Sequence, residues 1–214
     1  MMRTFGWPEF LFILEAAKWT IALSAIAFAG GSIVGLMVAL ARTAESRVLQ
    51  FAATVFTQIF QGTPLLLQLF LVFFGAPILG LDINPWLAAA AALILNSGAF
   101  LGEIWRGCIQ AVPRGQLEAA QALSLSYYWR MRDVVLPQAM KIAVAPTVGY
   151  LVQIIKGTSL AAIIGFTEIT RAGQIINNAT FQPLVVFGVV AAIYFVLCWP
   201  CLLYTSDAAD DLLC

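Results

Sequence analysis

The chain has 214 residues, of which 62% are hydrophobic and 10% are charged, and its formal net charge at pH 7 is +0. Its mean hydropathy is +0.92. Soluble domains carry about 25% charged residues. The composition therefore excludes a soluble enzyme, a disordered protein and a nucleic-acid binder, and it indicates an integral membrane protein.

The sequence contains no histidine, which is the commonest general base and metal ligand. Cys198 and Cys201 form a CxxC pair, but they lack the second ligand pair of a zinc site and the βαβ context of a redox motif. No P-loop or hydrolase motif occurs. We therefore expect no catalytic residue, no metal and no cofactor, and energy for any driven process must come from a partner or an ion gradient.

Five stretches contain no charged residue or only one: 19–41, 48–81, 83–102, 142–167 and 172–206. About 20 apolar residues are enough for a helix to cross the ~30 Å bilayer core. We predict an all-α integral membrane protein with about five transmembrane helices, in one domain over residues 1–200.

Residues 1–18 carry scattered charges and no small-residue cleavage pattern, so a cleaved signal peptide is not expected. Apolar residues recur at helical spacing there: Phe10, Leu11, Ile13, Leu14 and Ala17. This pattern predicts a short amphipathic helix on the membrane surface before the first span.

Most of the basic residues fall in the loops after the first and third spans: Arg42, Arg47, Arg106, Arg114, Arg130, Arg132 and Lys141. Cytoplasmic loops carry an excess of Lys and Arg. We therefore expect the N-terminus outside and the long loop after the third span in the cytoplasm.

Two features interrupt the apolar runs. Gly31 and Gly35, like Gly98 and Gly102, form GxxxG pairs, which serve either packing within one bundle or a subunit interface. The segment 61–64, Gln-Gly-Thr-Pro, must break the second run because proline lacks an amide proton. This break is either a plain kink or part of the wall of a pathway.

The segment over residues 103–140 is too polar to cross the membrane, but its pattern is too regular for a loop without secondary structure. We predict a helix over 116–123, a turn, and a second helix over 127–136 that Ser126 caps and Pro137 ends. This helix-turn-helix either docks another protein or rests on the bilayer surface.

The loop residues Glu118-Ala119-Ala120, Ser124, Val134, Leu136 and Pro137 resemble the "EAA" signature of ABC-importer permeases. Ser124 stands where that family has glycine. If the position needs a positive φ, serine costs on the order of 1 kcal/mol there.

Four further blocks narrow the resemblance to the polar amino acid permeases. QGTPLL at 61–66 resembles their RGTPLL, although Gln61 replaces the arginine; EIWRG at 103–107 resembles AEIxRGG; QAVPRGQ at 110–116 resembles QSVPKGQ; and KGTSL at 156–160 resembles K-[DNG]-TSL. The resemblance covers about residues 19–197.

The resemblance implies a multi-pass permease subunit in a bacterial cytoplasmic (inner) membrane. Such a subunit pairs with itself or a paralogous permease, docks P-loop ATPase subunits that hydrolyse the ATP, and receives amino acid from an extracytoplasmic binding protein. It also implies that a coupling element, residues 113–137, contacts the ATPase through Gly115, Glu118, Ala119, Ala120, Ser124, Leu136 and Pro137. From the residues alone, a secondary transporter or a channel for a small polar solute is the alternative.

Polar residues within or beside the spans are the candidates for a substrate path: Gln61, Thr63, Asn96, Ser97, Glu103, Lys156, Thr158 and Ser159. Each has a structural alternative. Lys156 can extend to the interface or pair with Glu168, Glu103 can pair with Arg106, and Asn96 and Ser97 can bond between helices.

Residues 201–214 are acidic where the family has a basic tail. They resemble the translation of a transposon-end sequencing adapter. We expect this tail to be non-native and the native gene to be interrupted near Pro200.

Overall fold

A computed structural model describes residues 4–210 of the chain, and in this part it contains helices, turns and loops but no strand. The helices are, in chain order, α1 (Trp7–Thr43), α2 (Arg47–Gly62), α3 (Leu65–Ile78), α4 (Pro85–Gln110), α5 (Arg114–Ala122), α6 (Tyr127–Trp129), η1 (Arg130–Val135), α7 (Leu136–Gly157), η2 (Thr158–Ala162), α8 (Ile169–Thr180) and α9 (Pro183–Asp210). The all-α prediction is confirmed.

Four described helical stretches are long and apolar enough to cross a membrane: α1, α4, the continuous stretch from α6 to η2, and α9. Helices α2 and α3 pass the same test only as a pair, which is bent by 101° at residues 63–64. The described residues therefore contain four candidate spans, or five when the bent pair counts as one.

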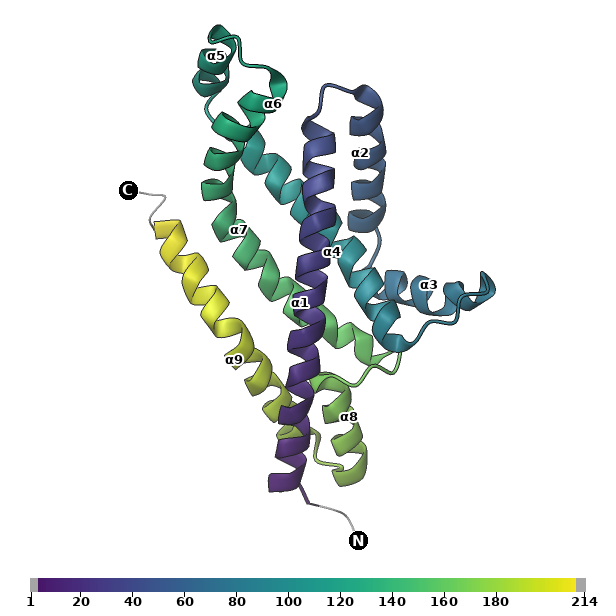
Figure 1. The fold of residues 1–214 in the computed structure, drawn as a ribbon. Coiled ribbons are helices and arrows are strands. Elements are labelled where there is room, and N and C mark those ends of the chain that lie inside the picture. The colour runs from purple at the N-terminus through teal and green to yellow at the C-terminus, as the bar shows by residue number, and fades with distance from the viewer. Residues whose placement is uncertain (1–3, 211–214) are drawn as a thin grey trace.

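Helix α1 crosses the whole molecule, from the end that carries α8 to the end that carries α5 and α6 (Figure 1). It is one continuous helix of 37 residues. The separate surface helix predicted before the first span is therefore wrong. After Pro8, no residue up to Thr43 breaks the helix, and Ile13, Ala16 and Ala17 are buried against α8 and α9 rather than facing a bilayer surface.

The two GxxxG pairs face each other where α1 crosses α4. A Cβ atom on Gly31 would lie 2.6 Å from the Cβ of Ser97, and one on Gly98 would lie 2.5 Å from Cγ1 of Val34. Such distances leave no room for any side chain. Of the two uses open from the sequence, packing within one chain is the one that the structure shows.

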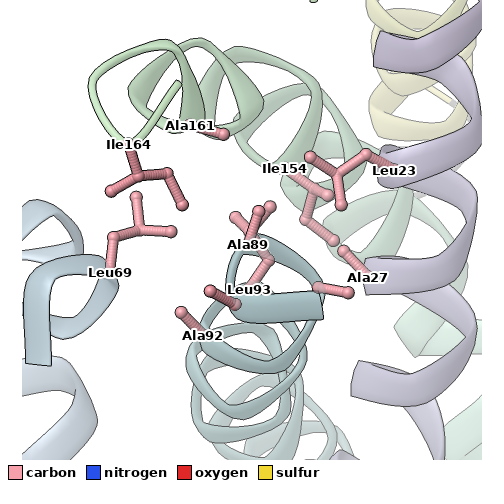
Figure 2. Packing of buried hydrophobic residues seen from close by; sticks show 11 residues of the cluster. Leu23, Ala27, Leu69, Ala89, Ala92, Leu93, Ile154, Ala161 and Ile164 are labelled. Carbon is pink, nitrogen blue, oxygen red and sulfur yellow. The ribbon is translucent and has the colours of Figure 1, made fainter. Parts of the chain in front are cut away.

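The central core gathers around α4, between α1, α3, α7 and η2 (Figure 2). Figure 2 labels Leu23, Ala27, Leu69, Ala89, Ala92, Leu93, Ile154, Ala161 and Ile164, all turned toward the same space. Several of these residues are alanine, and small side chains let helix backbones approach closely.

The fifth apolar run, 172–206, is not one span. Phe181 ends α8 with a left-handed backbone, φ 55°, and Pro183 starts α9. Since proline cannot continue the hydrogen bonding of a preceding helix, the run divides there. Only α9 is the span, and it runs on to Asp210; the last residues of the expected non-native tail, 211–214, lie outside the described residues.

Candidate functional site

The predicted coupling element begins with α5 and a tight turn. At the end of α5, the amide of Leu125 donates to the carbonyl of Ala120 (3.1 Å) and the amide of Ser124 donates to the carbonyl of Gln121 (2.8 Å). This pair of bonds is a Schellman motif, which places a left-handed residue, usually glycine, just after the helix. Ser124 has φ 55°, so the position does adopt the conformation that favours glycine.

The residues of the signature differ in their exposure. Gly115, Glu118 and Ala119 are exposed on α5, whereas Ala120 is 3% exposed and packs within the chain. Of the two alanines expected to contact the ATPase, only Ala119 therefore has an accessible side chain. Further along the element, Leu136 is half-buried and Pro137 is exposed.

The second helix of the element does not end at Pro137, in contrast to the prediction. It continues from Tyr127 to Ala162, with the π-helical turn η1 directly before Leu136 and Pro137. A π-turn changes the hydrogen-bond register, and the missing amide and the ring of a proline are accommodated in the first turn of the helix that follows. Ser126 stands at the N-cap position but makes no side-chain capping bond.

The break between α2 and α3 is held by two buried amide side chains. Gln68 Nε2 donates to the carbonyls of Phe60 (2.8 Å) and Thr63 (3.0 Å) and to Thr63 Oγ1 (2.9 Å). Asn96 Nδ2 on α4 donates to Gln68 Oε1 (3.1 Å) and to the carbonyl of Phe60 (3.4 Å). Carbonyls that the break removes from the helix ladder thus receive donors from side chains, as backbone at membrane depth requires.

A cavity of about 620 Å³ opens beside this break. We call it the break cavity, and it is lined by Thr63, Leu65, Asn96, Phe100, Tyr150, Gln153, Lys156, Gly157, Ser159 and Leu160. The break at residues 61–64 is therefore part of a cavity wall and not a plain kink. Within residues 4–210, the lining contains one cation, Lys156, and no carboxylate.

The structure brings four of the predicted path residues to this cavity: Thr63, Asn96, Lys156 and Ser159. Tyr150 Oη donates to Asn96 Oδ1 (3.4 Å) on the same wall. Lys156 lies in the last turn of α7, where a positive charge interacts favourably with the helix dipole. Lys156 is exposed and forms no ion pair with any described residue.

The other four predicted residues do not line the break cavity. Gln61 donates to the carbonyl of Ala99 (3.3 Å), and Ser97 is 1% exposed beneath Gly31. Thr158 is fully buried and donates to its own helix.

Glu103 lies toward the C-terminal end of α4, where it forms the expected ion pair with Arg106 and a second one with Arg42. The pairing of Lys156 with Glu168 does not occur. Glu168 instead accepts hydrogen bonds from the amides of Thr170 and Arg171 (2.8 Å each) and from Tyr194 Oη (2.7 Å). It caps α8, and burial raises the pKa of its carboxyl.

Sequence reasoning missed four lining or supporting residues: Gln68, Phe100, Tyr150 and Gln153. Two signals were available. Gln68 is the only polar side chain in the apolar run of α3. Tyr150, Gln153 and Lys156 recur every third residue along α7, which indicates one polar face of a helix.

The chain is similar in sequence to known transport proteins. The family described as "Binding-protein-dependent transport system inner membrane component" matches residues 31–207. The chain is 34% identical over 190 residues to the probable amino-acid ABC transporter permease YckA of Bacillus subtilis, covering 89% of this chain and 84% of that protein. It is 35% identical over 193 residues to the glutamine transport system permease GlnP of Escherichia coli K12, covering 89% and 88%.

Solved structures share the fold. An amino acid ABC transporter crystallised with histidines superposes with a TM-score of 0.86 at 32% identity, over 91% of each chain. The methionine ABC transporter MetNI in an inward-facing conformation superposes with a TM-score of 0.80 at 18% identity, over 95% of this chain and 97% of that one, which shows similarity of fold alone.

Proposed function

The chain belongs to the binding-protein-dependent transport system inner membrane components, and from this premise we propose that the break cavity is where a polar amino acid crosses the membrane. The protein is a multi-pass inner-membrane permease subunit of an ABC importer for amino acids. The observation that carries the proposal is the break cavity, because it lies at a broken span and because four residues predicted to form a path, Thr63, Asn96, Lys156 and Ser159, contribute polar side chains to its largely apolar lining.

The chemistry of the cavity favours one class of amino acid. Lys156 offers a cation for the α-carboxylate, and the side chains of Asn96, Tyr150, Gln153 and Thr63 can exchange hydrogen bonds with polar groups. The described lining offers no carboxylate to neutralise a cationic side chain. The proposed substrate is therefore an amino acid whose side chain is neutral and polar.

The orientation follows from the two ends of the bundle. The α5–α6 segment and the N-terminus lie at opposite ends (Figure 1). With the basic α5–η1 segment in the cytoplasm, in keeping with the positive-inside rule, the N-terminus is outside. An extracytoplasmic binding protein would then deliver substrate at the end that carries α8.

The partners follow from the same arrangement. ATP hydrolysis belongs to P-loop ATPase subunits that contact the coupling element through the exposed residues of α5, Gly115, Glu118 and Ala119. The permease works as a dimer with itself or with a paralogous permease. Closure of the ATPases would then move the packed helices of the bundle as rigid bodies and alternate access to the break cavity.

Reconstitution tests the proposal. The chain, its ATPase, its binding protein and any sister permease are placed in liposomes, and ATP-dependent uptake of radiolabelled glutamine and arginine is compared. We expect uptake of glutamine to exceed that of arginine, and Lys156→Met to reduce uptake roughly tenfold or more, because one charge-assisted contact contributes about 1.5–3 kcal/mol.

The matched control is Lys141→Met, which removes the same charge from the same helix outside the lining. Equal losses in both variants would refute the role of Lys156. Uptake that needs a proton gradient, or no ATPase at all, would instead support a secondary transporter or a channel.

A further inference from the structure

A second polar cavity lies at the end of the molecule that carries α5 and α6. It has a volume of about 710 Å³ and is formed where the C-terminal ends of α1 and α4 meet the start of α2 and the segment from α5 to η1. We call it the cationic cavity. Its polar lining includes Arg42, Glu45, Gln50, Gln110, Arg114 and Arg130. None of these residues lines the break cavity.

The charge in this cavity is unbalanced. Three arginines from three separate segments line it, against one carboxylate, that of Glu45. Glu103 forms an ion pair with Arg42, but it also pairs with Arg106. The negative charge of Glu103 is therefore offset by the positive charge of Arg106. The surroundings of the cavity therefore stay net positive.

Arg130 is the most confined of these cations. Its side chain is 15% exposed, stacks over the ring of Tyr127 and reaches only one carboxylate oxygen, Glu45 Oε1, at 3.8 Å. Its Nε atom is buried and has no hydrogen-bond partner among the described residues. A buried guanidinium donor without an acceptor destabilises the folded chain unless a ligand or water supplies the acceptor.

We propose that the cationic cavity binds a phosphoryl group. Arginine presents a planar fork of donors that matches the oxygens of phosphate, and several arginines around one pocket are a common arrangement for this anion. The amide side chains of Gln50 and Gln110 add neutral donors on the same walls. The buried Nε of Arg130 gains the acceptor that the protein does not provide.

Two sources carry this chemistry: the headgroup of an anionic phospholipid and free phosphate in the cytoplasm. The cavity adjoins the ends of two spans, at the level where headgroups meet water, and basic pockets between helices on the cytoplasmic side are suited to anionic headgroups. This argument for a lipid rests on the proposed orientation; the argument for a phosphoryl group does not.

A bound phosphoryl group would connect the coupling element to the membrane bundle. Arg130 and Arg114 belong to the coupling element, and Arg42 ends α1. The described connection consists of an apolar cluster that includes Ala39, Ile109, Met131 and Val135, the Arg130–Glu45 ion pair, and a hydrogen bond from Tyr127 Oη to the carbonyl of Thr43 at 3.3 Å. An anion shared by the arginines would add charge-assisted bonds to this connection.

Lipid retention by the full-length chain tests the proposal without any transport assay. The chain is placed in nanodiscs of phosphatidylcholine that contain a minor fraction of phosphatidylglycerol, released into the gas phase, and the lipid that stays bound is identified by native mass spectrometry. In a second arm, inorganic phosphate is added in pure phosphatidylcholine, and the thermal shift is compared with that in chloride of equal ionic strength.

The variants are Arg130→Gln and Arg114→Gln, with Arg132→Gln as the matched control. Arg132 lies two residues from Arg130, is exposed, and does not line the cavity. We expect about tenfold weaker retention of phosphatidylglycerol in both test variants, because each loses one charge-assisted contact, and unchanged retention in the control. Arg114 is exposed, so its variant stays informative if Arg130→Gln does not fold.

The outcomes divide as follows. Phosphatidylglycerol that stays bound and depends on Arg130 or Arg114 assigns the site to a lipid, and a phosphate-specific thermal shift with the same dependence assigns it to free phosphate; both support the proposal. Binding of neither probe, or an equal loss in Arg132→Gln, would overturn it.

Discussion

Helices α4 and α9 are both apolar enough to cross a membrane, but α4 is central in the bundle and α9 is peripheral. In an 18-residue apolar segment of α4, 61% is buried within the chain, whereas in the corresponding segment of α9 only 17% is buried. At its contact with α1, α4 carries Gly98 and Gly102, whereas α9 carries large side chains such as Leu184, which is 92% exposed. Hydropathy finds both spans, but the small residues show which one is central.

The largest effect that we expect comes from a methyl group placed on α4. In Gly98→Ala the new Cβ would lie 2.5 Å from Val34 Cγ1, so α1 and α4 must separate, and the free energy of unfolding falls by about 2 kcal/mol. The matched control is Gly188→Ala on α9, where a Cβ meets nothing within 4 Å. Unfolding in detergent is followed by circular dichroism, and similar losses in both variants would contradict the comparison.

A second loss of stability is expected where α3 contacts α4 through hydrogen bonds. Gln68→Leu removes the donor to the carbonyls of Phe60 and Thr63 and the acceptor of the buried Asn96 amide, and it lowers the free energy of unfolding by about 1–3 kcal/mol because a buried polar group is left without its partner. Gln153→Leu is the control, since Gln153 is exposed in the break cavity and has no hydrogen bond to a described side chain. If uptake falls in both but stability falls only in Gln68→Leu, Gln68 has a supporting role.

In the coupling element we expect a smaller effect on stability, and it is a gain rather than a loss. Ser124→Gly relieves the left-handed backbone at φ 55° and raises stability by up to about 1 kcal/mol. The control is Ser126→Gly, because Ser126 has φ −62° and gains nothing from glycine. Thermal unfolding measures both variants, and no difference between them would mean that the turn is not strained.

The smallest effect is a change of slope with pH. Burial raises the pKa of Glu168 above its ordinary value of 4.5, so the folded chain holds a proton that the unfolded chain has released. Stability contributed by this carboxyl is therefore present at low pH and is lost as the pH rises from the ordinary value through the raised one. Glu168→Gln should flatten this part of the unfolding profile; an unchanged slope would refute it.

The sequence was sufficient for the parts of the fold that depend on local chemistry. Charge-poor runs located the candidate spans, although the last span begins only at Pro183; Pro64 located the break, and the pattern around Glu118 located helix α5. Several interpretations were wrong where tertiary packing or a local helix irregularity decides the outcome. Helix α1 continues through residues 7–18 because α8 and α9 cover it, Pro137 lies within a helix because η1 precedes it, and Ala120 faces inward.

The candidate site was predicted in part for a similar reason. Thr63, Asn96, Lys156 and Ser159 carry polar groups at membrane depth, and polarity can be read from sequence. Which of the polar residues meet at one cavity depends on the 101° bend between α2 and α3, and the sequence shows a break but no angle. The sequence also does not show which way a side chain points around its helix axis. Thr158 is fully buried, although Lys156 of the same KGTSL motif is exposed.

The uninterrupted length of α1 has a mechanical consequence. In its first half, its Thr20 hydroxyl accepts a hydrogen bond from the amide of Ile169 at the start of α8 (3.3 Å), and at its C-terminal end the carbonyl of Thr43 accepts one from Tyr127 (3.3 Å). No break in α1 separates these two contacts. We therefore expect a tilt of α1 at the Tyr127 contact to be transmitted along one continuous helix to the start of α8.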